Sequence, residues 1–462
     1  MRILLITKDT EQYTDWFPQG TAYIAAVLLE KGFKVSIYHQ NVNHYSDEHL
    51  TNYLDNNSFD VVGVSVIGGY YQYRKLLKIS NAINASKQRP FYIIGGHCCS
   101  PEPEYFLKKT EADAIVIGEG EMTVVELIDA VANHKPLSRV KGIAYWEFED
   151  VVVNEERQLI KDVDTIPLPA YSLFPINYYR LIRMPGASKT DFVLPVLSGR
   201  GCTFECTFCY RMDEGFRQRS NESVIGEVSF LKKDYGITYI CFSDELLMSS
   251  KRRTISLCEA FLKADLGIHW NCNGRLNYAK PDVLKLMKLA GCVFINYGIE
   301  AMDDQVLKNM NKGLTIRQIV EGVENTIAAG ISPGLNMLFG NIGDNKETIN
   351  NAVEFLLKYD DGSQLRTIKP VTPYPGSPLY YTAVKEGMIK DCEDFYENKH
   401  LNSDLITANF TELNNDEFHS CLFDANKRIF KKYYNSQLST TVEYARKLYI
   451  DKDASFRGFR QR

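Results

Sequence analysis

Three cysteines that lie close together in the sequence are the residues best suited to chemistry. Cys202, Cys206 and Cys209 are four and three positions apart, and they follow an apolar, strand-like run at residues 192–197. Glycines after this run let the backbone turn sharply. Loops of this kind typically bind zinc or an iron–sulfur cluster. Because the loop offers no fourth ligand for a closed zinc site, the sequence favours a cluster that leaves one iron open to a small molecule.

The loop at residues 198–210 resembles the cluster-binding loop of the radical S-adenosylmethionine (SAM) enzymes. In that family the cysteines have the same spacing and an aromatic residue precedes the last one, as Phe208 does here. The resemblance implies that Cys202, Cys206 and Cys209 hold a 4Fe–4S cluster whose open iron is chelated by SAM. It also implies that an electron from the cluster cleaves SAM to methionine and a 5′-deoxyadenosyl radical, which abstracts hydrogen from the substrate. A structural zinc knuckle or a loop of free thiols is the alternative.

The elements that must position this loop are strands that alternate with helices. Further strands are predicted at residues 239–242, 268–273, 293–297, 334–339 and 367–371. With the run before the cysteines they make six units, which match the partial (β/α)6 barrel of the radical SAM family. Groups that contact ligands are expected at the carboxyl ends of these strands.

Polar residues and a glycine stand near those strand ends and are candidates for binding SAM. The candidates are Phe208, Asp244, Glu245, Arg275, Glu300 and Gly340. A carboxylate can accept hydrogen bonds from the ammonium group or the ribose hydroxyls, and Arg275 can pair with the methionine carboxylate. The segments around Glu300 and Gly340 resemble recurring family segments near the adenosine. The plainer alternatives are helix capping by the carboxylates and a surface position for Arg275.

The first third of the chain also alternates strands and helices. Strands are predicted at residues 3–7, 34–39, 60–67, 91–94 and 114–117, and a helix at residues 20–30. Near-continuous apolar strands separated by helices indicate a parallel sheet covered on both faces. Glycines after three of these strands mark where a ligand can approach the backbone. We therefore predict an α/β protein with a doubly wound, Rossmann-like N-terminal domain.

This N-terminal order resembles the cobalamin-binding domain of one large class of radical SAM enzymes. The resemblance rests on residues 20–32 and on the Gly-Gly-His and Gly-Glu-Gly-Glu segments at 95–97 and 118–121. It implies cobalamin contacts from Gly68, Tyr70, Gly96, His97, Gly118, Glu119 and Gly120. Tyr70 would shield the lower corrin face or pack on the next helix, and His97 would contact the cofactor or be a plain loop residue.

Two other readings of this domain are open. The glycine loops also suit a doubly wound domain without a ligand, whereas an NAD site is disfavoured because the first loop lacks Gly-x-Gly-x-x-Gly. The chain has no Asp-x-His-x-x-Gly motif, which supplies an axial histidine in many cobalamin proteins, and residues 47–49 have the wrong spacing. Radical enzymes of this class often lack that motif, so its absence is compatible with cobalamin.

Length and composition indicate several domains. The chain has 462 residues, too many for one compact core, and its 45% hydrophobic and 24% charged residues are ordinary for a globular protein. We predict a cobalamin-binding-like domain at 1–135, a linker with a hairpin at 136–185, a radical SAM core at 186–395 and a small helical region at 396–462. A helix predicted at 418–434 either shapes the substrate pocket at the barrel mouth or simply caps the barrel.

Net charge and cysteine content limit which cellular compartment and which binding partners are expected. The net charge is −5 and no long basic stripe is present, which argues against nucleic acid as a partner. No apolar run reaches the roughly 18 residues of a membrane span, and the N-terminus reads as a strand rather than a signal peptide. The eleven cysteines lie mostly in predicted strands and helices, which favours a reducing cytoplasm. The family resemblance implies a small-molecule substrate and a reducing partner such as flavodoxin or ferredoxin.

The leading hypothesis is a cobalamin-dependent radical SAM methyltransferase that acts on an unactivated carbon of a small molecule or natural product. One SAM would methylate reduced cobalamin, and a second would give the radical. A radical SAM enzyme of the same architecture that transfers no methyl group, such as a cyclase, dehydrogenase or eliminase, is the first alternative. A non-catalytic cobalamin or metal carrier is the second. The sequence identifies neither the substrate nor a catalytic side chain.

Overall fold

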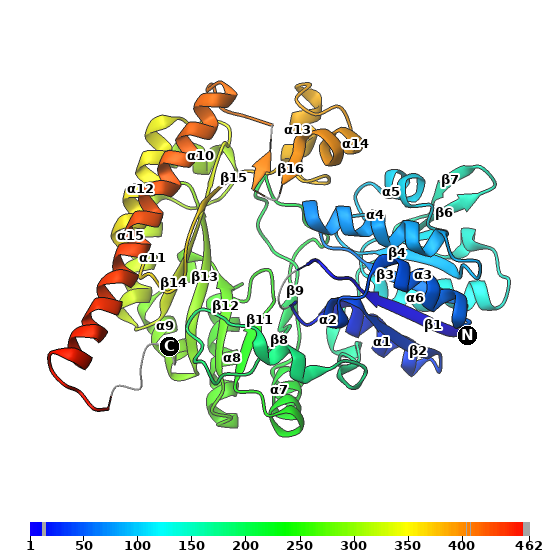
Figure 1. Ribbon diagram of the computed structural model, residues 1–462, viewed down its shortest axis with the longest axis horizontal. Coiled ribbons are helices and arrows are strands. Elements are labelled where there is room, and N and C mark those ends of the chain that lie inside the picture. Colours follow the sequence, from blue (N-terminus) through cyan, green and yellow to red (C-terminus); the bar gives the residue numbers. More distant parts are fainter. Residues whose placement is uncertain (12–14, 403, 407, 456–462) are drawn as a thin grey trace.

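The computed structural model has two α/β halves side by side, with a long helix along one outer edge (Figure 1). It describes residues 1–11, 15–402, 404–406 and 408–455. In Figure 1 the N-terminal half is on the right, in blue and cyan, and the half that carries the cysteine loop is on the left. Within the described ranges, no helix combines the length and apolar character needed to cross a membrane.

The N-terminal half is built on a seven-stranded sheet in the order β2-β1-β3-β4-β5-β6-β7. Its strands are β1 (Arg2–Thr7), β2 (Lys34–His39), β3 (Val61–Ser65), β4 (Phe91–Gly95), β5 (Ala114–Val116), β6 (Ile143–Glu147) and β7 (Asp150–Val153). Its helices are α1 (Gln19–Glu30), α2 (Gln40–Asn43), α3 (Asp47–Asn56), α4 (Tyr70–Asn84), α5 (Pro103–Thr110) and α6 (Gly120–Ala132). The strands β1 to β5 run parallel, as predicted. The strand order reverses between β1 and β3, and ligands bind outside the carboxyl ends of strands at such a point.

The strands β1, β3, β4 and β5 are largely buried on both faces, which explains their apolar sequences, whereas β2 at the edge of the sheet is partly exposed. Ile3 and Leu4 of β1 and Val62 of β3 are each 0% exposed. After β4, Gly96 has a φ of +105°, and a Cβ there would lie 2.5 Å from the carbonyl oxygen of Val66. Only glycine tolerates both conditions, so the loops after β3 and β4 can approach one another closely.

The hairpin that was expected in the linker belongs to the first sheet. Its strand β6 pairs antiparallel with β5 and with β7. Trp146 ties the hairpin to the sheet, because its indole N–H donates to the carbonyl of Ala112 at 2.9 Å. The sheet therefore extends past residue 135. The connector that follows contains short 3₁₀ turns at Val163–Thr165, Tyr171–Leu173 and Ile176–Leu181, and another such turn, Leu137–Arg139, precedes the hairpin.

The second half is built on six parallel strands in the order β15-β14-β13-β12-β11-β8. The strands are β8 (Val193–Val196), β11 (Tyr239–Phe242), β12 (His269–Gly274), β13 (Cys292–Glu300), β14 (Ser332–Phe339) and β15 (Ile368–Pro370). The helices between them are α7 (Asn221–Tyr235), α8 (Lys251–Ala264), α9 (Pro281–Leu289), α10 (Asp304–Asn309), α11 (Ile316–Ala328) and α12 (Lys346–Tyr359), with a 3₁₀ turn at Leu276–Tyr278. All six strands predicted for the barrel are present and parallel.

Short polar residues start several of these helices at the carboxyl edge of the sheet. The side chains of Ser220, Ser250 and Asn345 each accept a hydrogen bond from a backbone N–H in the first turn that follows. Such caps satisfy donors that the helix itself leaves free. They fix where each helix begins and hence how the loops above the sheet are placed.

The described residues of the segment 371–410 leave the second sheet and pack into the hydrophobic core of the N-terminal half. The segment contains α13 (Pro378–Lys385), α14 (Cys392–Asp394), a π-helical turn (Phe395–Lys399), β16 (His400–Asn402) and β17 (Leu405–Ile406). Tyr396 stacks on Tyr73 of α4 with ring centres 4.4 Å apart. Glu397 accepts hydrogen bonds from the side chains of Tyr73 and Arg74, each at 2.6 Å. Helix is therefore present up to Lys399 and again from Asn415, but the strands β16 and β17 interrupt the helical region that was expected from residue 396, because this segment packs on the N-terminal half.

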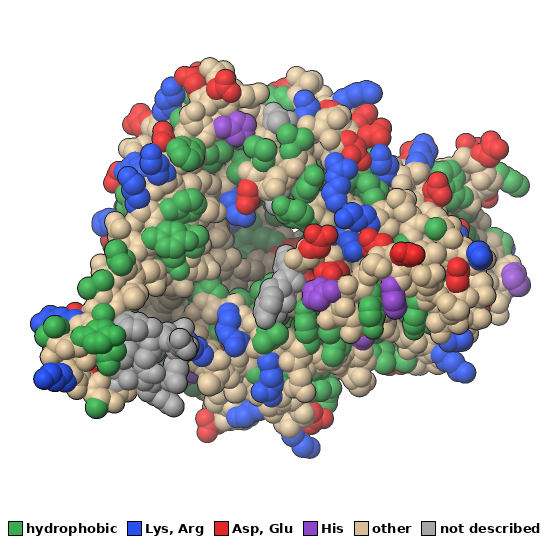
Figure 2. All heavy atoms as spheres, viewed as in Figure 1, with side chains coloured by type: hydrophobic (Ala, Val, Ile, Leu, Met, Phe, Trp, Pro, Cys, Tyr) green, Lys and Arg blue, Asp and Glu red, His purple; other side chains and the backbone are tan. Residues whose placement is uncertain are grey.

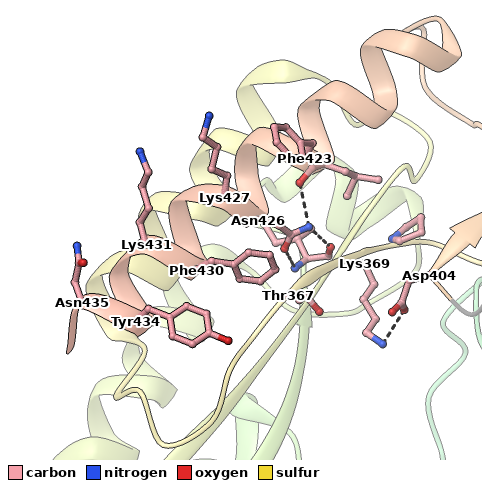
Figure 3. Close-up of a pocket in the computed structure, with 13 residues that line it drawn as sticks. Thr367, Lys369, Asp404, Phe423, Asn426, Lys427, Phe430, Lys431, Tyr434 and Asn435 are labelled. Carbon is pink, nitrogen blue, oxygen red and sulfur yellow. Dashed lines mark hydrogen bonds and ion pairs between the residues drawn. The ribbon is translucent and has the colours of Figure 1, made fainter. Parts of the chain in front are cut away.

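The last element is α15 (Asn415–Tyr449), which is longer than the helix predicted at 418–434. It packs on α12 and along the free edge of β15. Asn426 takes the place of a neighbouring strand there, since its side chain accepts from the N–H of Ile368 (2.9 Å) and donates to the C=O of Ile368 (3.0 Å). Figure 3 shows this contact beside a groove of about 630 Å³ between α15 and β15. The helix closes the edge of the sheet, and its contact with a substrate stays a prediction.

Candidate active site

The cysteine loop starts where β8 ends, at the carboxyl edge of the six-stranded sheet. β9 (Gly199–Arg200) pairs antiparallel with β10 (Arg217–Gln218), so the two ends of the loop are held together. Cys206 is 8% exposed, Cys202 is half-buried and Cys209 is exposed. Burial is the main cause that raises the pKa of the Cys209 thiol to about 11, and charge on the other two thiols contributes. The three thiols thus lie near enough to interact, as ligands of one cluster must.

Two segments that are distant in sequence hold the middle of the loop. The N–H of Thr207 donates to the C=O of Met310 (3.0 Å), and the C=O of Thr207 accepts from the N–H of Leu379 (2.8 Å). The side chain of Asn311 donates to the C=O of Glu205 (3.0 Å). These partners come from the turn after α10 and from the first turn of α13. The loop conformation is therefore fixed by backbone contacts on both sides.

Asp244 holds the start of the cysteine loop. Its carboxylate is completely buried and accepts from the N–H of Ser198 (3.1 and 3.0 Å) and from the Ser198 hydroxyl (2.8 Å). Burial raises the pKa of Asp244 to about 6. The structure thus gives Asp244 an internal role, and its contact with SAM stays a prediction. The neighbouring Glu245 has an exposed side chain and is better placed to reach a ligand.

Arg275 is a buried cation beside the loop. It is 6% exposed, its guanidinium carbon lies 3.4 Å from the centre of the Phe204 ring, and it donates to the C=O of Lys312. Burial lowers the pKa of Arg275, and the nearby Cys206 opposes that shift. Within the described part of the chain its buried Nε has no hydrogen-bond partner. A buried guanidinium with an unused N–H suits a site that receives negative charge, such as cluster thiolates or the SAM carboxylate.

Glu300 and Lys312 form a buried ion pair next to Phe208. The Glu300 Oε1 and the Lys312 Nζ are 3.0 Å apart, and the ammonium lies 5.6 Å from the centre of the Phe208 ring. Glu300 has a φ of +72°, which costs a residue with a side chain roughly 1 kcal/mol or more. The pairing of β13 with β14 also shifts there. Lys312 was not among the predicted site residues, and the signal for it was the Asn-Lys-Gly turn after α10.

Gly340 lies under α15. It has a φ of +103°, and a Cβ there would lie 2.8 Å from the ring of Phe418. Phe418 stacks on Phe339 with ring centres 5.2 Å apart. The N–H of Gly340 donates to the carboxylate of Asp344 at 3.0 Å. Helix docking therefore explains why glycine is needed here, and a contact between Gly340 and SAM stays a prediction.

A chain of asparagine amides crosses three neighbouring strands and was not expected from the sequence. Asn336 of β14 donates to Asn296 of β13 (3.0 Å), and Asn296 donates to Asn273 of β12 (3.1 Å). Asn273 in turn donates to the C=O of Asp244 (2.8 Å). Amides aligned in this way can bind ribose hydroxyls or a polar part of a substrate. The available signal was that asparagine is disfavoured inside strands.

The carboxyl ends of β3, β4 and β5 form a glycine-rich edge in the N-terminal half. Gly69 and Gly118 have φ values of +127° and +71°, and a Cβ at either would meet no atom within 4 Å. The Ser100 hydroxyl donates to the C=O of Gly96 (2.9 Å) and accepts from the N–H of Gly118 (3.1 Å). The loops are thus tied together while Gly69 and Gly118 adjoin open space. Such an edge, next to the point between β1 and β3 where the strand order reverses, fits a large cofactor such as cobalamin.

Gly68 and Tyr70 lie against the segment that returns from the second half. A Cβ at Gly68 would be 3.8 Å from the ring of Tyr374. The rings of Tyr70 and His400 meet edge to face with centres 6.1 Å apart. Tyr70 also lies under the guanidinium of Arg74, at 5.3 Å. The two predicted residues are therefore at the interface of the halves, and their contact with cobalamin stays a prediction.

His97 faces the cysteine loop. Its ring meets that of Tyr210, the residue after Cys209, edge to face with centres 6.2 Å apart. Burial lowers the pKa of His97, and the carboxylate of Asp213 opposes the shift. The edge predicted to bind cobalamin and the loop predicted to bind the cluster are thus in direct contact.

Glu119 and Gly120 have internal partners. The carboxylate of Glu119 accepts from Arg200 and from Arg217, each at 2.8 Å. A Cβ at Gly120 would lie 2.9 Å from Ile24 of α1, so this glycine allows α1 to pack closely. These contacts account for both residues, and their predicted contact with cobalamin is untested.

Figure 2 shows a hollow in the middle of the molecule, between the two halves. In the described ranges, no three His, Cys, Asp or Glu side chains converge as they would around one metal ion. A cubane cluster differs from zinc, because each thiolate binds its own iron and the thiols stay apart. The cysteines together with buried Arg275 fit such a cluster.

Comparison with known proteins agrees with this geometry. Residues 196–356 match the radical SAM superfamily, and residues 10–128 match the B12 binding domain. A protein of Pyrococcus horikoshii named as an uncharacterized methyltransferase is 30% identical over 400 residues, which are 84% of each chain. The anaerobic magnesium-protoporphyrin IX monomethyl ester cyclase of Rubrivivax gelatinosus is 26% identical over 82% of this chain and 69% of its own.

A solved structure shows the same fold. The radical SAM methyltransferase TsrM of Kitasatospora setae, with cobalamin and a [4Fe–4S] cluster bound, has a TM-score of 0.70 at 18% identity. The match covers 83% of this chain and 78% of that one. The two matching families and the cysteine loop imply a 4Fe–4S cluster, SAM and cobalamin as cofactors. The chain therefore belongs to the radical SAM superfamily, among the cobalamin-dependent enzymes that carry an N-terminal B12-binding domain.

Proposed function

We propose that this cobalamin-dependent radical SAM enzyme is a methyltransferase that acts on an unactivated carbon of a small molecule or natural product. The observation that carries the proposal is the direct contact between His97 of the glycine-rich edge and Tyr210 of the cysteine loop. Methyl transfer needs a methyl carrier, SAM and the acceptor carbon in one cavity, because proximity supplies much of the rate. The name of the Pyrococcus horikoshii relative supports the same function.

The chain's own residues would bind the cofactors, orient SAM and shield the site from water. Cys202, Cys206 and Cys209 would hold the cluster, which with SAM supplies a 5′-deoxyadenosyl radical, while bound cobalamin supplies a transferable methyl group. Arg275 would pair with the methionine carboxylate through its unused Nε–H. Glu245 would accept from the SAM ammonium group.

The chain also fixes the walls of the cavity. Asp244 anchors the loop through Ser198, and the Glu300–Lys312 pair holds Phe208 beside the cluster site. Tyr210 lies against His97 and Tyr374 lies against Gly68, so both tyrosine rings stand beside the glycine-rich edge. Aromatic walls exclude water, which would otherwise quench a reactive intermediate.

The test starts from protein reconstituted without oxygen, mixed with hydroxocobalamin and desalted. Retained corrin absorption beside the cluster band is expected. With a reductant and SAM that carries a deuterated methyl group, we expect S-adenosylhomocysteine together with 5′-deoxyadenosine. Small molecules of a cell extract that gain the deuterated methyl group would identify the acceptor. A cluster without corrin, or 5′-deoxyadenosine with no S-adenosylhomocysteine, would contradict methyl transfer.

A radical enzyme that transfers no methyl group is the second candidate, because the Rubrivivax gelatinosus relative is named a cyclase. Under this alternative the product carries no deuterium from SAM, and cobalamin is not consumed as a methyl donor. The same labelling experiment therefore separates the two functions.

A further inference from the structure

A cluster of five charged side chains joins the two halves beside the cysteine loop. The interface charge cluster, as we call it, consists of Glu119, Glu121, Arg200, Asp213 and Arg217. Arg200 contacts Glu119 at 2.8 Å and also Glu121. Arg217 contacts both oxygens of Glu119, at 2.9 and 2.8 Å, and also Asp213. Glu119 directly precedes α6 and Glu121 lies in its first turn, whereas the other three residues flank the cysteines in the sequence.

The interface charge cluster is buried. Its side chains are between 5% and 16% exposed. Charges removed from water are costly unless they are paired, and an apolar replacement of equal volume is often at least as stable. Stability alone therefore does not explain five charges here. What ion pairs add over apolar contacts is direction, because the N–H groups of a guanidinium donate to their partners in one plane.

The carboxylate of Glu119 is saturated by protein donors. It accepts one hydrogen bond from Arg200, two from Arg217 and one from the N–H of Ile160 (2.7 Å). A carboxylate offers about four acceptor positions. Burial by itself would raise the pKa of Glu119, but Arg217, the Ile160 N–H and Arg200 hold it below its usual value. The carboxylate stays ionised and has no position left for a cobalamin amide.

Each side of the interface charge cluster is connected to one cofactor site. Arg200 precedes Cys202 by two residues, and β9 and β10 place Arg217 directly across from it. On the other side, Glu119 follows Gly118, whose N–H is held by Ser100 at the glycine-rich edge. A shift of the guanidinium groups would therefore move the first cluster ligand relative to that edge.

We infer that the interface charge cluster positions the cysteine loop against the glycine-rich edge and so sets the distance between the iron–sulfur cluster and cobalt. Arg200 and Arg217 are positioning residues in this role, since they contact neither cofactor site directly. The inference applies whether or not the enzyme transfers a methyl group. It needs only the two cofactors that the family carries.

The test compares two conservative variants with a control in the full-length reconstituted protein. Glu121→Gln keeps the shape of the side chain but removes one ion pair, and Arg217→Lys keeps the charge but removes the fork. The control is Asp360→Asn, which breaks a pair of similar burial with Arg366 (6% and 4% exposed) inside the second half. The measurement is the dipolar coupling between the reduced cluster and cob(II)alamin by pulsed electron paramagnetic resonance.

We expect a broader or shifted distance distribution in both variants and an unchanged one in the control. The ratio of 5′-deoxyadenosine released to product formed should also rise in the variants. Distributions that superimpose on the wild type in both variants would overturn the inference, as would an equal shift in the control.

A second measurement covers variants that lose corrin. Hydrogen exchange of the cofactor-free protein should speed up in residues 197–219 and 118–123 for Glu121→Gln and not for Asp360→Asn. Equal protection of these residues in wild type and Glu121→Gln would likewise overturn the inference.

Discussion

At the residue scale, the three cysteines of the loop differ from the other cysteines in their surroundings. Cys202, Cys206 and Cys209 lie on a loop beside a buried guanidinium, whereas Cys241 is a residue of strand β11. Thiolates bind iron, and a nearby cation favours the charged cluster. The loop is held by its backbone, so removing one thiol leaves its path intact.

The first prediction concerns these thiols. Alanine in place of Cys202, Cys206 or Cys209 should reduce iron and sulfide after reconstitution to background, while retained corrin stays near the wild-type amount. Cys241→Ala is the matched control and should bind the full cluster. Iron analysis and the absorption spectrum measure both. A full cluster in any of the three loop variants would show that the ligands are wrongly assigned.

The second prediction concerns Asp244, which burial holds at a pKa of about 6 instead of 3.8. Because the folded state keeps the proton more tightly than the unfolded state, stability is highest below the unfolded pKa and falls as pH rises towards 6. The difference between the two pKa values corresponds to a change of about 3 kcal/mol in the free energy of unfolding. In urea unfolding of the cluster-free protein, wild type should lose stability relative to Asp244→Asn between pH 4 and 6. A difference that is constant over this range would contradict the prediction.

The role of the three cysteines as cluster ligands could be predicted from the sequence, because the pattern that indicates it lies within one short segment. The partners of Asp244 and Glu119 could not be predicted in the same way. Asp244 bonds to Ser198 and Glu119 to Arg200, far away in sequence, and each pairing depends on how strands and domains meet. An acidic residue at a strand end reads equally well as a ligand contact and as an internal anchor.

At the element scale, the helix α15 covers the free edge of the strand β15 and binds its backbone through a side chain. The amide of Asn426 satisfies both backbone groups of Ile368, so the edge strand does not offer them to another chain (Figure 3). The same asparagine also donates to the C=O of Leu422 in its own helix (3.0 Å). A single side chain therefore links the helix to the sheet.

The third prediction tests this link. Asn426→Ala leaves the backbone groups of Ile368 unpaired, and we expect a loss of about 1–3 kcal/mol in the free energy of unfolding. Asn435→Ala, in an exposed residue of the same helix and groove, should change stability by less than about 0.5 kcal/mol. Urea unfolding followed by circular dichroism measures both. Equal stability of the two variants would mean that the edge contact is unimportant.

Elements were predictable where their pattern is local. Strand-like runs that alternate with helices gave all six strands of the barrel and the five parallel strands of the first sheet. The pattern of the hairpin β6–β7 shows that two strands pair but not that β6 joins β5. The strands β16 and β17, inside the region that was expected to be helical, were not predicted, because their position depends on how this segment packs on the N-terminal half.

At the scale of the whole molecule, the two halves are interlocked rather than merely adjacent. Residues 371–410 complete the core of the N-terminal half, although they follow the barrel in sequence. The Cys98 thiol and the Tyr396 hydroxyl are 3.3 Å apart, which connects this segment to the loop after β4. Cys98 and Tyr396 are 298 residues apart in the sequence, so the glycine-rich edge depends on a distant segment of the chain.

The fourth prediction follows from this interlocking. Tyr396→Ala should remove the stack on Tyr73 and open a cavity beside α4, at a cost of the order of 3–5 kcal/mol. Because the cavity lies in the N-terminal half, hydrogen exchange should speed up in residues 70–84 and 96–100 and much less in β11 and β12. Corrin retention should fall while iron content is preserved, since the cysteine loop is also held by Met310 and Asn311 of the second half.

The matched control is Tyr381→Ala, a change of the same size at a tyrosine that is 53% exposed on α13. It should leave stability, exchange and corrin retention near the wild-type values. Faster exchange confined to residues 371–410 in Tyr396→Ala, with α4 unaffected, would mean that the segment is only an appendage. Faster exchange in α4 would instead show that the barrel's own continuation builds the cobalamin-binding half, so that the two cofactor sites cannot form independently.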